Sequence, residues 1–279
     1  MPVPSSFNDI TQKREIRDFS GWVWYDRNFF VPATWKNGNI LLRLGSVNYL
    51  ASVYVNGKHA INHTGGHLPF ETDVTSLLKL GSENHITVAV NNVLSAHTLP
   101  PGRVETKNDT RMPATKFTES FPNFDFFNYA GIHRSVLLSF VPLIRITDLT
   151  VVTSTLSDHT TGVVKFDIAT NAPSNTKLAF EVELLDRQGK IAAKAESASG
   201  ELKVQKANLW WPFTMSGDSE PGYLYRLVIA INSGGQLIDS IQQNIGIRSV
   251  SISGNQLLVN ERPVYLRGFG RHEDQNVSL

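Results

Sequence analysis

Apolar residues recur at every second position over much of this chain, and that spacing constrains the fold more than any other feature. In residues 85–91 the apolar side chains Ile86, Val88 and Val90 alternate with less apolar neighbours. The same alternation returns in residues 164–168, 178–184 and 223–231. Because successive side chains of a strand point to opposite faces, this period predicts strands with one buried face.

Turn residues separate the alternating segments. Asn56-Gly57, Arg187-Gln188-Gly189 and Ser233-Gly234-Gly235 each lie beside an apolar strand pattern and favour tight turns. Only residues 73–80 resemble a helical turn, with Asp73 or Thr72 as the N-cap and Gly81 as the stop. Many short strands joined by turns predict an all-β chain built from sandwiches.

The pattern divides the chain into three segments. Residues 1–141 are rich in aromatic side chains and loops, and Pro142 marks a boundary because proline cannot donate to a central sheet. Residues 142–250 hold seven or so short strands, the number of an immunoglobulin-like sandwich. Residues 251–279 begin with a hairpin whose strands are expected at 257–259 and 264–267, with the turn at Asn260-Glu261.

Charge balance and the absence of cysteine exclude several classes of function. The 279 residues include 26 basic and 25 acidic side chains, without the basic excess of a nucleic-acid-binding protein. There is no Cys, and the eight His have no metal-ligand spacing. Neither a nucleotide-binding glycine loop nor an apolar run of about 20 residues occurs. We therefore expect no cofactor, no metal, no nucleic-acid partner and no membrane segment.

Several longer strings occur in an order that identifies a family. They are Phe7-Asn8-Asp9-Ile10, Gly45-Ser46-Val47-Asn48-Tyr49, Gly65-Gly66-His67-Leu68-Pro69-Phe70-Glu71, Asp125-Phe126-Phe127-Asn128-Tyr129-Ala130-Gly131-Ile132-His133-Arg134, Leu209-Trp210-Trp211-Pro212, Pro221-Gly222-Tyr223-Leu224-Tyr225, Gly246-Ile247-Arg248 and Gly268-Phe269-Gly270-Arg271-His272-Glu273-Asp274. Together they cover nearly the whole chain and resemble the β-glucuronidases. These enzymes belong to a clan of retaining glycosidases that includes β-galactosidases and β-mannosidases.

The resemblance implies three domains. Residues 1–141 correspond to a sugar-binding-like jelly roll whose first strands are missing, residues 142–250 to an immunoglobulin-like sandwich, and residues 251–279 to the start of a (β/α)₈ barrel. Such a barrel needs about 250 residues, but 29 follow Val250. Since the family's two catalytic glutamates lie in the barrel, we expect a chain truncated at both ends and without catalytic residues of its own.

The carboxylates at the end of the chain do not form a catalytic pair. Retaining hydrolysis needs two carboxyl groups about 5–5.5 Å apart, whereas Glu273 and Asp274 are adjacent and would point to opposite faces of an extended segment. The resemblance instead places His272 and Asp274 just beyond the first barrel strand, at the end where barrel active sites form. There His272 would hydrogen-bond a sugar hydroxyl, and both residues are assigned to substrate binding. Glu273 or Asp274 holding the loop in shape is the alternative.

Asp125 is the third candidate for substrate binding. It lies among phenylalanines, where a carboxylate is costly to bury unless it is hydrogen-bonded. From the residues alone, an aspartate that caps a backbone N–H in a turn is favoured. The resemblance reverses this preference, because the matching aspartate of the family reaches from the jelly roll into the sugar pocket.

Two aromatic residues allow a different sugar contact. Trp210-Trp211 have the chemistry of a stacking platform, but packing at the entry to a sandwich strand is the favoured interpretation.

Three sequons, at Asn62, Asn108 and Asn276, are candidate N-glycosylation sites. They fit a lysosomal or secreted parent enzyme, although this chain shows no signal peptide.

The leading hypothesis is the non-catalytic front half of a β-glucuronidase whose full-length form hydrolyses β-D-glucuronides with retention, in carbohydrate or glycosaminoglycan breakdown. The family also implies a homo-oligomer. The alternatives are a carbohydrate-binding or interaction protein without an enzymatic role, and an inactive gene fragment.

Overall fold

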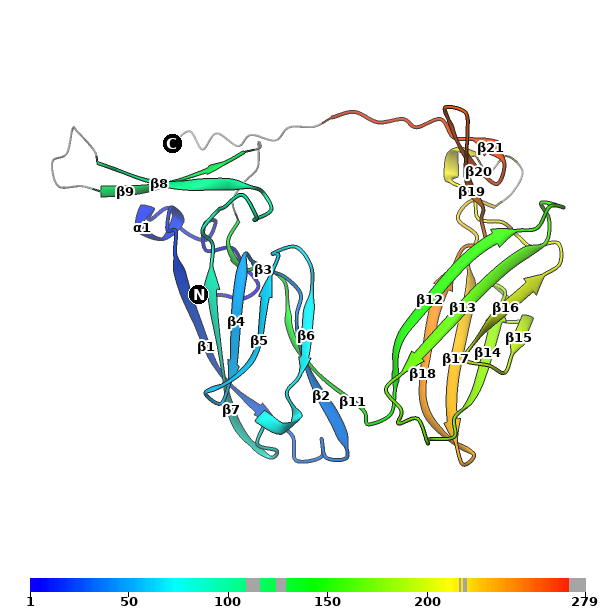
Figure 1. Cartoon of the computed structure of the whole chain (residues 1–279), viewed down its shortest axis with the longest axis horizontal. Coiled ribbons are helices and arrows are strands. Elements are labelled where there is room, and N and C mark those ends of the chain that lie inside the picture. The colour runs from blue at the N-terminus through cyan, green and yellow to red at the C-terminus, as the bar shows by residue number, and fades with distance from the viewer. Residues whose placement is uncertain (109–115, 124–128, 216, 218–219, 271–279) are drawn as a thin grey trace. The chain divides into compact units, whose positions relative to one another are not determined.

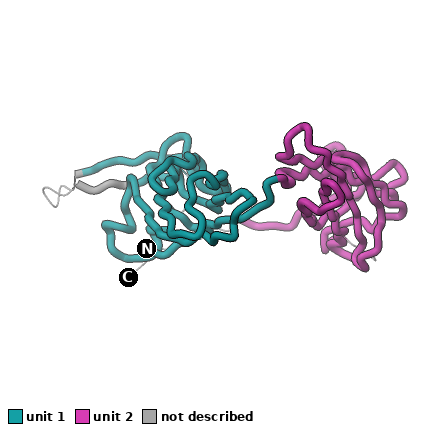
Figure 2. Tube along the Cα trace, turned by 90° about the horizontal axis from the view of Figure 1, so that it is seen from below, with its two compact units in different colours: residues 1–143, 272–279 teal, residues 144–271 magenta. Residues whose placement is uncertain are grey.

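The computed structural model describes residues 1–108, 116–123, 129–215, 217 and 220–270. Two compact units make up this part of the chain, shown in different colours in Figure 2. The first extends from Met1 to Leu143, and the second begins at Ile144.

The first unit is a sandwich of two antiparallel sheets, visible in Figure 1. One sheet has the strand order β1-β7-β4-β5, formed by β1 (Trp22–Val31), β7 (Ser82–Asn91), β4 (Leu50–Val55) and β5 (Lys58–Thr64). The other has the order β11-β2-β6, formed by β11 (Val136–Pro142), β2 (Gly38–Leu44) and β6 (Phe70–Asp73).

The core of this unit forms where the alternating side chains of the two sheets meet. Strand β2 contributes Ile40, Leu42 and Leu44, each at most 2% exposed, and β4 contributes Val53 and Val55. Full burial of a side chain of this size contributes about 1.5–3 kcal/mol. The alternation predicted for residues 85–91 is confirmed, because Ile86, Val88 and Val90 of β7 face this core.

Two further strand pairs belong to this unit. The short strands β3 (Val47–Asn48) and β10 (Gly131–Ile132) pair with each other, and β8 (Gly102–Asn108) pairs with β9 (Lys116–Pro122) as a separate ribbon.

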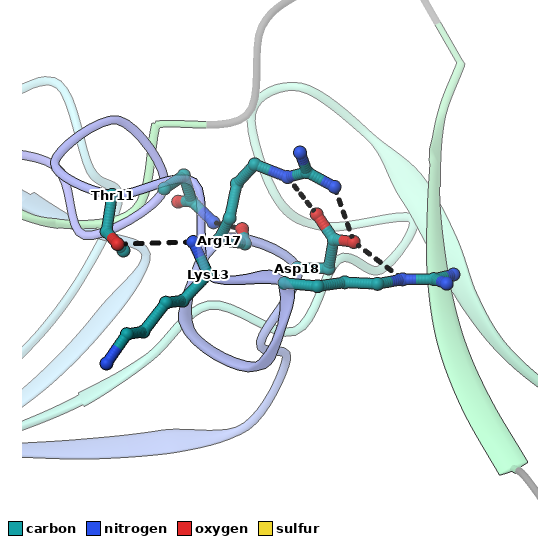
Figure 3. A network of polar contacts seen from close by, with 6 residues as sticks. Thr11, Lys13, Arg17 and Asp18 are labelled. Carbon is teal, nitrogen blue, oxygen red and sulfur yellow. Dashed lines mark hydrogen bonds and ion pairs between the residues drawn. The ribbon is translucent and has the colours of Figure 1, made fainter.

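The helical prediction was partly wrong. Within residues 73–80 only the 3-10 turn η1 (Thr75–Leu77) forms, and the Asp73 carboxylate accepts a hydrogen bond from the Thr75 amide at 2.9 Å. A one-turn helix that the sequence pattern did not reveal, α1 (Arg14–Arg17), precedes β1. Asp18 follows it and binds the side chains of both Arg14 and Arg17. Figure 3 shows the contact with Arg17. These contacts are local and polar, so no apolar periodicity marks the helix.

The second unit contains a sandwich of seven strands in the described part of the chain. One sheet has the order β12-β13-β16, formed by β12 (Ile146–Thr155), β13 (Gly162–Thr170) and β16 (Ser199–Val204). The other has the order β15-β14-β17-β18, formed by β15 (Ile191–Ala195), β14 (Ala179–Leu185), β17 (Tyr225–Ser233) and β18 (Gln236–Ile245). The core includes Val164, Leu184, Leu227 and Ile229, all fully buried.

The tryptophan pair packs against this sandwich. Trp211 is 8% exposed, and the Trp210 amide donates to the Ile247 carbonyl at 2.8 Å. The guanidinium groups of Arg248 and Arg262 lie 4.8 and 5.0 Å from the ring centroids of Trp210 and Trp211, respectively. This geometry favours the packing interpretation over a sugar platform. The 3-10 turn η2 (Phe213–Met215) follows.

A small sheet with the order β19-β20-β21 completes the unit, formed by β19 (Val250–Ser253), β20 (Gln256–Val259) and β21 (Arg262–Pro263). The predicted turn is present, because Asn260 and Glu261 both have positive φ. The predicted second strand at 264–267 is wrong: this two-residue turn starts the pairing at once, with Val259 opposite Arg262. Residues 264–270 have no regular secondary structure.

The predicted all-β class, with a jelly-roll sandwich before an immunoglobulin-like one, is confirmed. No helix within the described residues is long and apolar enough to cross a membrane.

Candidate functional site

The three residues predicted to bind substrate, Asp125, His272 and Asp274, lie outside the described residues, as does the sequon at Asn276. The backbone of Asn108 ends β8, and Asn62 is exposed on β5. No group of three or more His, Asp or Glu side chains that would hold a metal occurs in the described ranges. The candidate site is therefore built from the residues that border the Asp125 segment.

Two buried asparagines fix the chain directly after residue 128. Asn48 of β3 is fully buried, and its Nδ2 donates to the Tyr129 carbonyl at 2.7 Å. Asn8 accepts a hydrogen bond from the Ala130 amide at 2.7 Å and donates through Nδ2 to the Arg17 carbonyl at 2.6 Å. The backbone at Tyr129 and Ala130 is thus held by two segments distant in sequence.

An imidazole–phenol cluster lies next to these asparagines. The ring centroids of Tyr129 and His133 are 5.0 Å apart with an edge-on geometry, and the ring of His67 lies 5.8 Å from Tyr129 and 6.5 Å from His133. Arg134 donates to the His67 carbonyl at 3.0 Å, and the His67 Nε2 donates to the Leu99 carbonyl at 3.1 Å. Two loops and β10 therefore meet around Tyr129.

The hydrogen bonds of Ser46 indicate that Nε2 of His133 carries a proton. The Ser46 hydroxyl donates to the Gly66 carbonyl, so its oxygen accepts from the Nε2–H of His133 at 3.0 Å. The other ring nitrogen, Nδ1, is buried. Burial lowers the pKa of His133, the charges of Arg134 and His67 lower it further, and a backbone hydrogen bond with Gly131 partly opposes this shift. The neutral imidazole is therefore the favoured form near pH 7.

The loop above Asn48 requires glycine. A Cβ on Gly66 would lie 1.7 Å from Asn48 Oδ1. Asn48 Oδ1 is itself buried without a hydrogen-bond partner in the described structure. The site thus holds one buried acceptor, Asn48 Oδ1, near the phenol of Tyr129. An unpaired buried acceptor carries a free-energy cost.

Sequence reasoning did not assign roles to Asn8, Asn48, His67 or His133. All four lie in the strings that carry the family resemblance. The sequence feature that could have revealed these residues is a polar side chain within an otherwise apolar segment, such as Asn48 between Val47 and Tyr49.

Comparison with family models identifies both sandwiches. Residues 3–142 match the model of the glycosyl hydrolases family 2, sugar binding domain, and residues 144–248 match the model of glycosyl hydrolases family 2. The chain belongs to glycosyl hydrolase family 2. Within this family 2 chain, the site described above lies entirely in the part that matches the sugar binding domain.

The similar proteins are β-glucuronidases, which confirms the resemblance predicted from the strings. The enzymes of Mus musculus and Sus scrofa are 43% and 44% identical to this chain over 99% of its length. A β-glucuronidase from Ruminococcus gnavus, solved with a C6-substituted uronic isofagomine, is 37% identical, with a TM-score of 0.85 over 99% of this chain. The chain covers 43% of the two mammalian relatives and 44% of the bacterial structure, less than half of each.

Proposed function

We propose that this chain is the non-catalytic front half of a retaining β-glucuronidase and that it supplies one side of the sugar pocket. The observation that carries the proposal is the identity of 41–44% with mammalian β-glucuronidases across 99% of the chain. The domain scheme of 1–141, 142–250 and 251–279 belongs to the proposal, as does the assignment of residues 251–279 to the start of the catalytic barrel.

The contribution of this chain to the reaction is to hold and orient the sugar. Asp125, four residues before Tyr129, would accept hydrogen bonds from sugar hydroxyls, and ionised acceptors make stronger bonds of this kind than neutral ones. Asn8 and Asn48 anchor the backbone of Ala130 and Tyr129, the described residues that follow it in the chain. A fixed carboxylate orients the ring before the bond breaks, which lowers the entropic cost of reaching the transition state.

His272 and Asp274 would contact the sugar from the barrel side. Neither acts as acid or nucleophile in this proposal, because the reaction needs two carboxyl groups about 5–5.5 Å apart across the anomeric carbon. We expect those groups in the remaining part of the full-length enzyme, and therefore no turnover by the 279-residue polypeptide alone. The full-length enzyme would act on β-glucuronides of glycans, as a lysosomal or secreted homo-oligomer.

The test uses chromogenic substrates. The full-length protein should release nitrophenol from the β-D-glucuronide and much more slowly from the β-D-galactoside and β-D-mannoside. A preference for either neutral sugar would refute the glucuronidase assignment. The purified 279-residue polypeptide should show no turnover; activity that survives repurification and disappears in His272→Ala would refute its assignment as non-catalytic.

A further inference from the structure

The outer face of the β1-β7-β4-β5 sheet carries exposed aromatic side chains that the proposed function does not use. On β1, Trp22 is 47% exposed, Trp24 is 61% exposed and Phe30 is 65% exposed. All three occupy even positions of the strand and share its outward face, since the core residue Val31 lies at an odd position. Single exposed apolar residues are common, but an uncovered pair of indoles two residues apart is a candidate contact surface.

The sequon at Asn62 lies on the same face. The strand register places Trp24 opposite Ala89, Ala89 opposite Ser52, and Ser52 opposite Asn62. These four residues therefore form one cross-strand row, and the hydrogen bond between Ser52 Oγ and Asn62 Oδ1 at 2.7 Å confirms that their side chains share a face. Between the ends of the row lie the half-buried Ser52, whose Oγ is 3.2 Å from the Tyr54 hydroxyl, and Ala89, which is 2% exposed, so a glycan on this face passes over these side chains.

The geometry of Asn62 suits an attached glycan. Its Oδ1 accepts hydrogen bonds from Ser52 and from His59 Nε2 at 2.9 Å, while its Nδ2 has no partner in the described structure. Thr64, the other sequon residue, is exposed and lies two residues further on the same face. Strand β5 is the edge strand of its sheet in the described residues. On the side of β5 away from β4, a bulky group at Asn62 therefore meets no further strand of this sheet.

The distance along the row fits the core of an N-glycan. Strands β5 and β1 are separated by three strand spacings of about 4.8 Å each, or about 14 Å. The linear part of the glycan core, two N-acetylglucosamines and a mannose, is long enough to cover it. The apolar faces of these pyranose rings stack on indole rings, which offer large flat surfaces at low entropic cost.

We propose that Asn62 is N-glycosylated and that its glycan crosses Ser52 and Ala89 to pack on Trp24. The chain's own N-glycan would thus cover the exposed aromatic face. Passage through the secretory pathway is the one element that rests on the proposed function. The experiment therefore supplies a secretion leader, so that failure of glycosylation is distinguished from a wrong assignment of the parent enzyme.

The 279-residue chain is secreted from animal cells behind a cleavable leader, and the tryptic peptide 59–79, which contains one sequon, is analysed by mass spectrometry. We expect a glycan on Asn62 and its loss in Thr64→Ala, a change that keeps Asn62 and its hydrogen bonds. An unmodified peptide 59–79 in the secreted chain overturns the proposal.

Packing on Trp24 is tested by hydroxyl-radical labelling and thermal unfolding. Oxidation of Trp24 should fall at least twofold in the glycosylated chain relative to Thr64→Ala, whereas that of Phe30, about 20 Å along the strand, should not change. The first unit should unfold about 3 °C higher with the glycan. The difference in Tm between the glycosylated chain and Thr64→Ala should vanish when Trp24→Ala is added to both and persist when Phe30→Ala is added. It should also be absent when the unaltered chain and Thr64→Ala are made in bacteria. A glycan that leaves Trp24 equally reactive, or a difference in Tm that survives Trp24→Ala, overturns the packing.

Discussion

Asn8 should be among the most important polar residues for the stability of the first sandwich. Its side chain joins three segments, because Oδ1 accepts from the Ala130 amide and Nδ2 donates to the Arg17 carbonyl at the end of α1. Ala130 is fully buried, so no water can replace the lost partner in Asn8→Ala. Leaving a buried donor unpaired costs about 1–3 kcal/mol, and loss of the bond to the exposed Arg17 carbonyl adds about 0.5–1.5 kcal/mol.

The expected loss of unfolding free energy in Asn8→Ala is therefore about 1.5–4.5 kcal/mol. For a unit of this size that corresponds to a fall in Tm of roughly 5–17 °C. The assay is thermal unfolding of the 279-residue chain, with segment-resolved hydrogen exchange to assign each transition to residues 1–143 or to the second unit. Only the transition of the first unit should move, because Asn8 and its partners belong to it.

A matched asparagine provides the control. Asn28 lies on the exposed face of β1, where it bonds to Glu83 and His85. Asn28→Ala should cost less than about 0.5 kcal/mol, as surface substitutions generally do. If Asn8→Ala shifts Tm no more than Asn28→Ala, or shifts the second unit equally, Asn8 does not anchor the segment as inferred here.

Two further predictions concern the cluster around Tyr129. Gly66→Ala should prevent normal folding of the first sandwich, because its Cβ would overlap Asn48 Oδ1. The control Gly268→Ala, with no atom within 4 Å of its Cβ, should be neutral. Equal yields of soluble protein from the two variants would contradict the contact between Gly66 and Asn48. Burial depresses the pKa of His133 below its ordinary value of 6.5, so the unfolded chain binds this proton more readily than the folded one. Stability of the first unit should therefore fall as the pH drops below about 6.5, and His133→Gln should weaken this dependence in urea titrations while the exposed His97→Gln leaves it unchanged. An unaltered pH profile in His133→Gln would show that another group is responsible.

The local alternation of apolar residues was enough to predict the sandwiches, because burial of one face decides which segments form strands. In β7 the positions of Ile86, Val88 and Val90 determine the register of the whole sheet core. Helix α1 could not be predicted in this way, since its contacts are ion pairs around Asp18 rather than a buried stripe. The hairpin at Asn260-Glu261 was predicted at the turn but not in its second strand, because the left-handed conformation of both turn residues begins the pairing at Arg262.

The candidate site was predictable only through the family strings. The roles of Asn8 and Asn48 depend on backbone groups at Tyr129 and Ala130, more than 80 residues away in sequence. Nothing local in the sequence reveals such long-range pairing. The Nε2 of His133 likewise bonds to Ser46, whose hydroxyl is oriented by the Gly66 carbonyl, 20 residues further along the chain.

The contribution of this chain to the sugar pocket is tested most directly at Asp125. In the full-length protein, Asp125→Ala should lower kcat/KM for a chromogenic β-D-glucuronide by about 10- to 100-fold, since a hydrogen bond to a charged group is worth about 1.5–3 kcal/mol. Asp125→Asn, which keeps an acceptor but loses the charge, should give a smaller loss, and the exposed Asp9→Ala should be unchanged. The melting temperature should be the same in all of these proteins. A kcat/KM for Asp125→Ala equal to that of the unaltered enzyme would contradict the account and leave Asp125 as a residue that caps a turn.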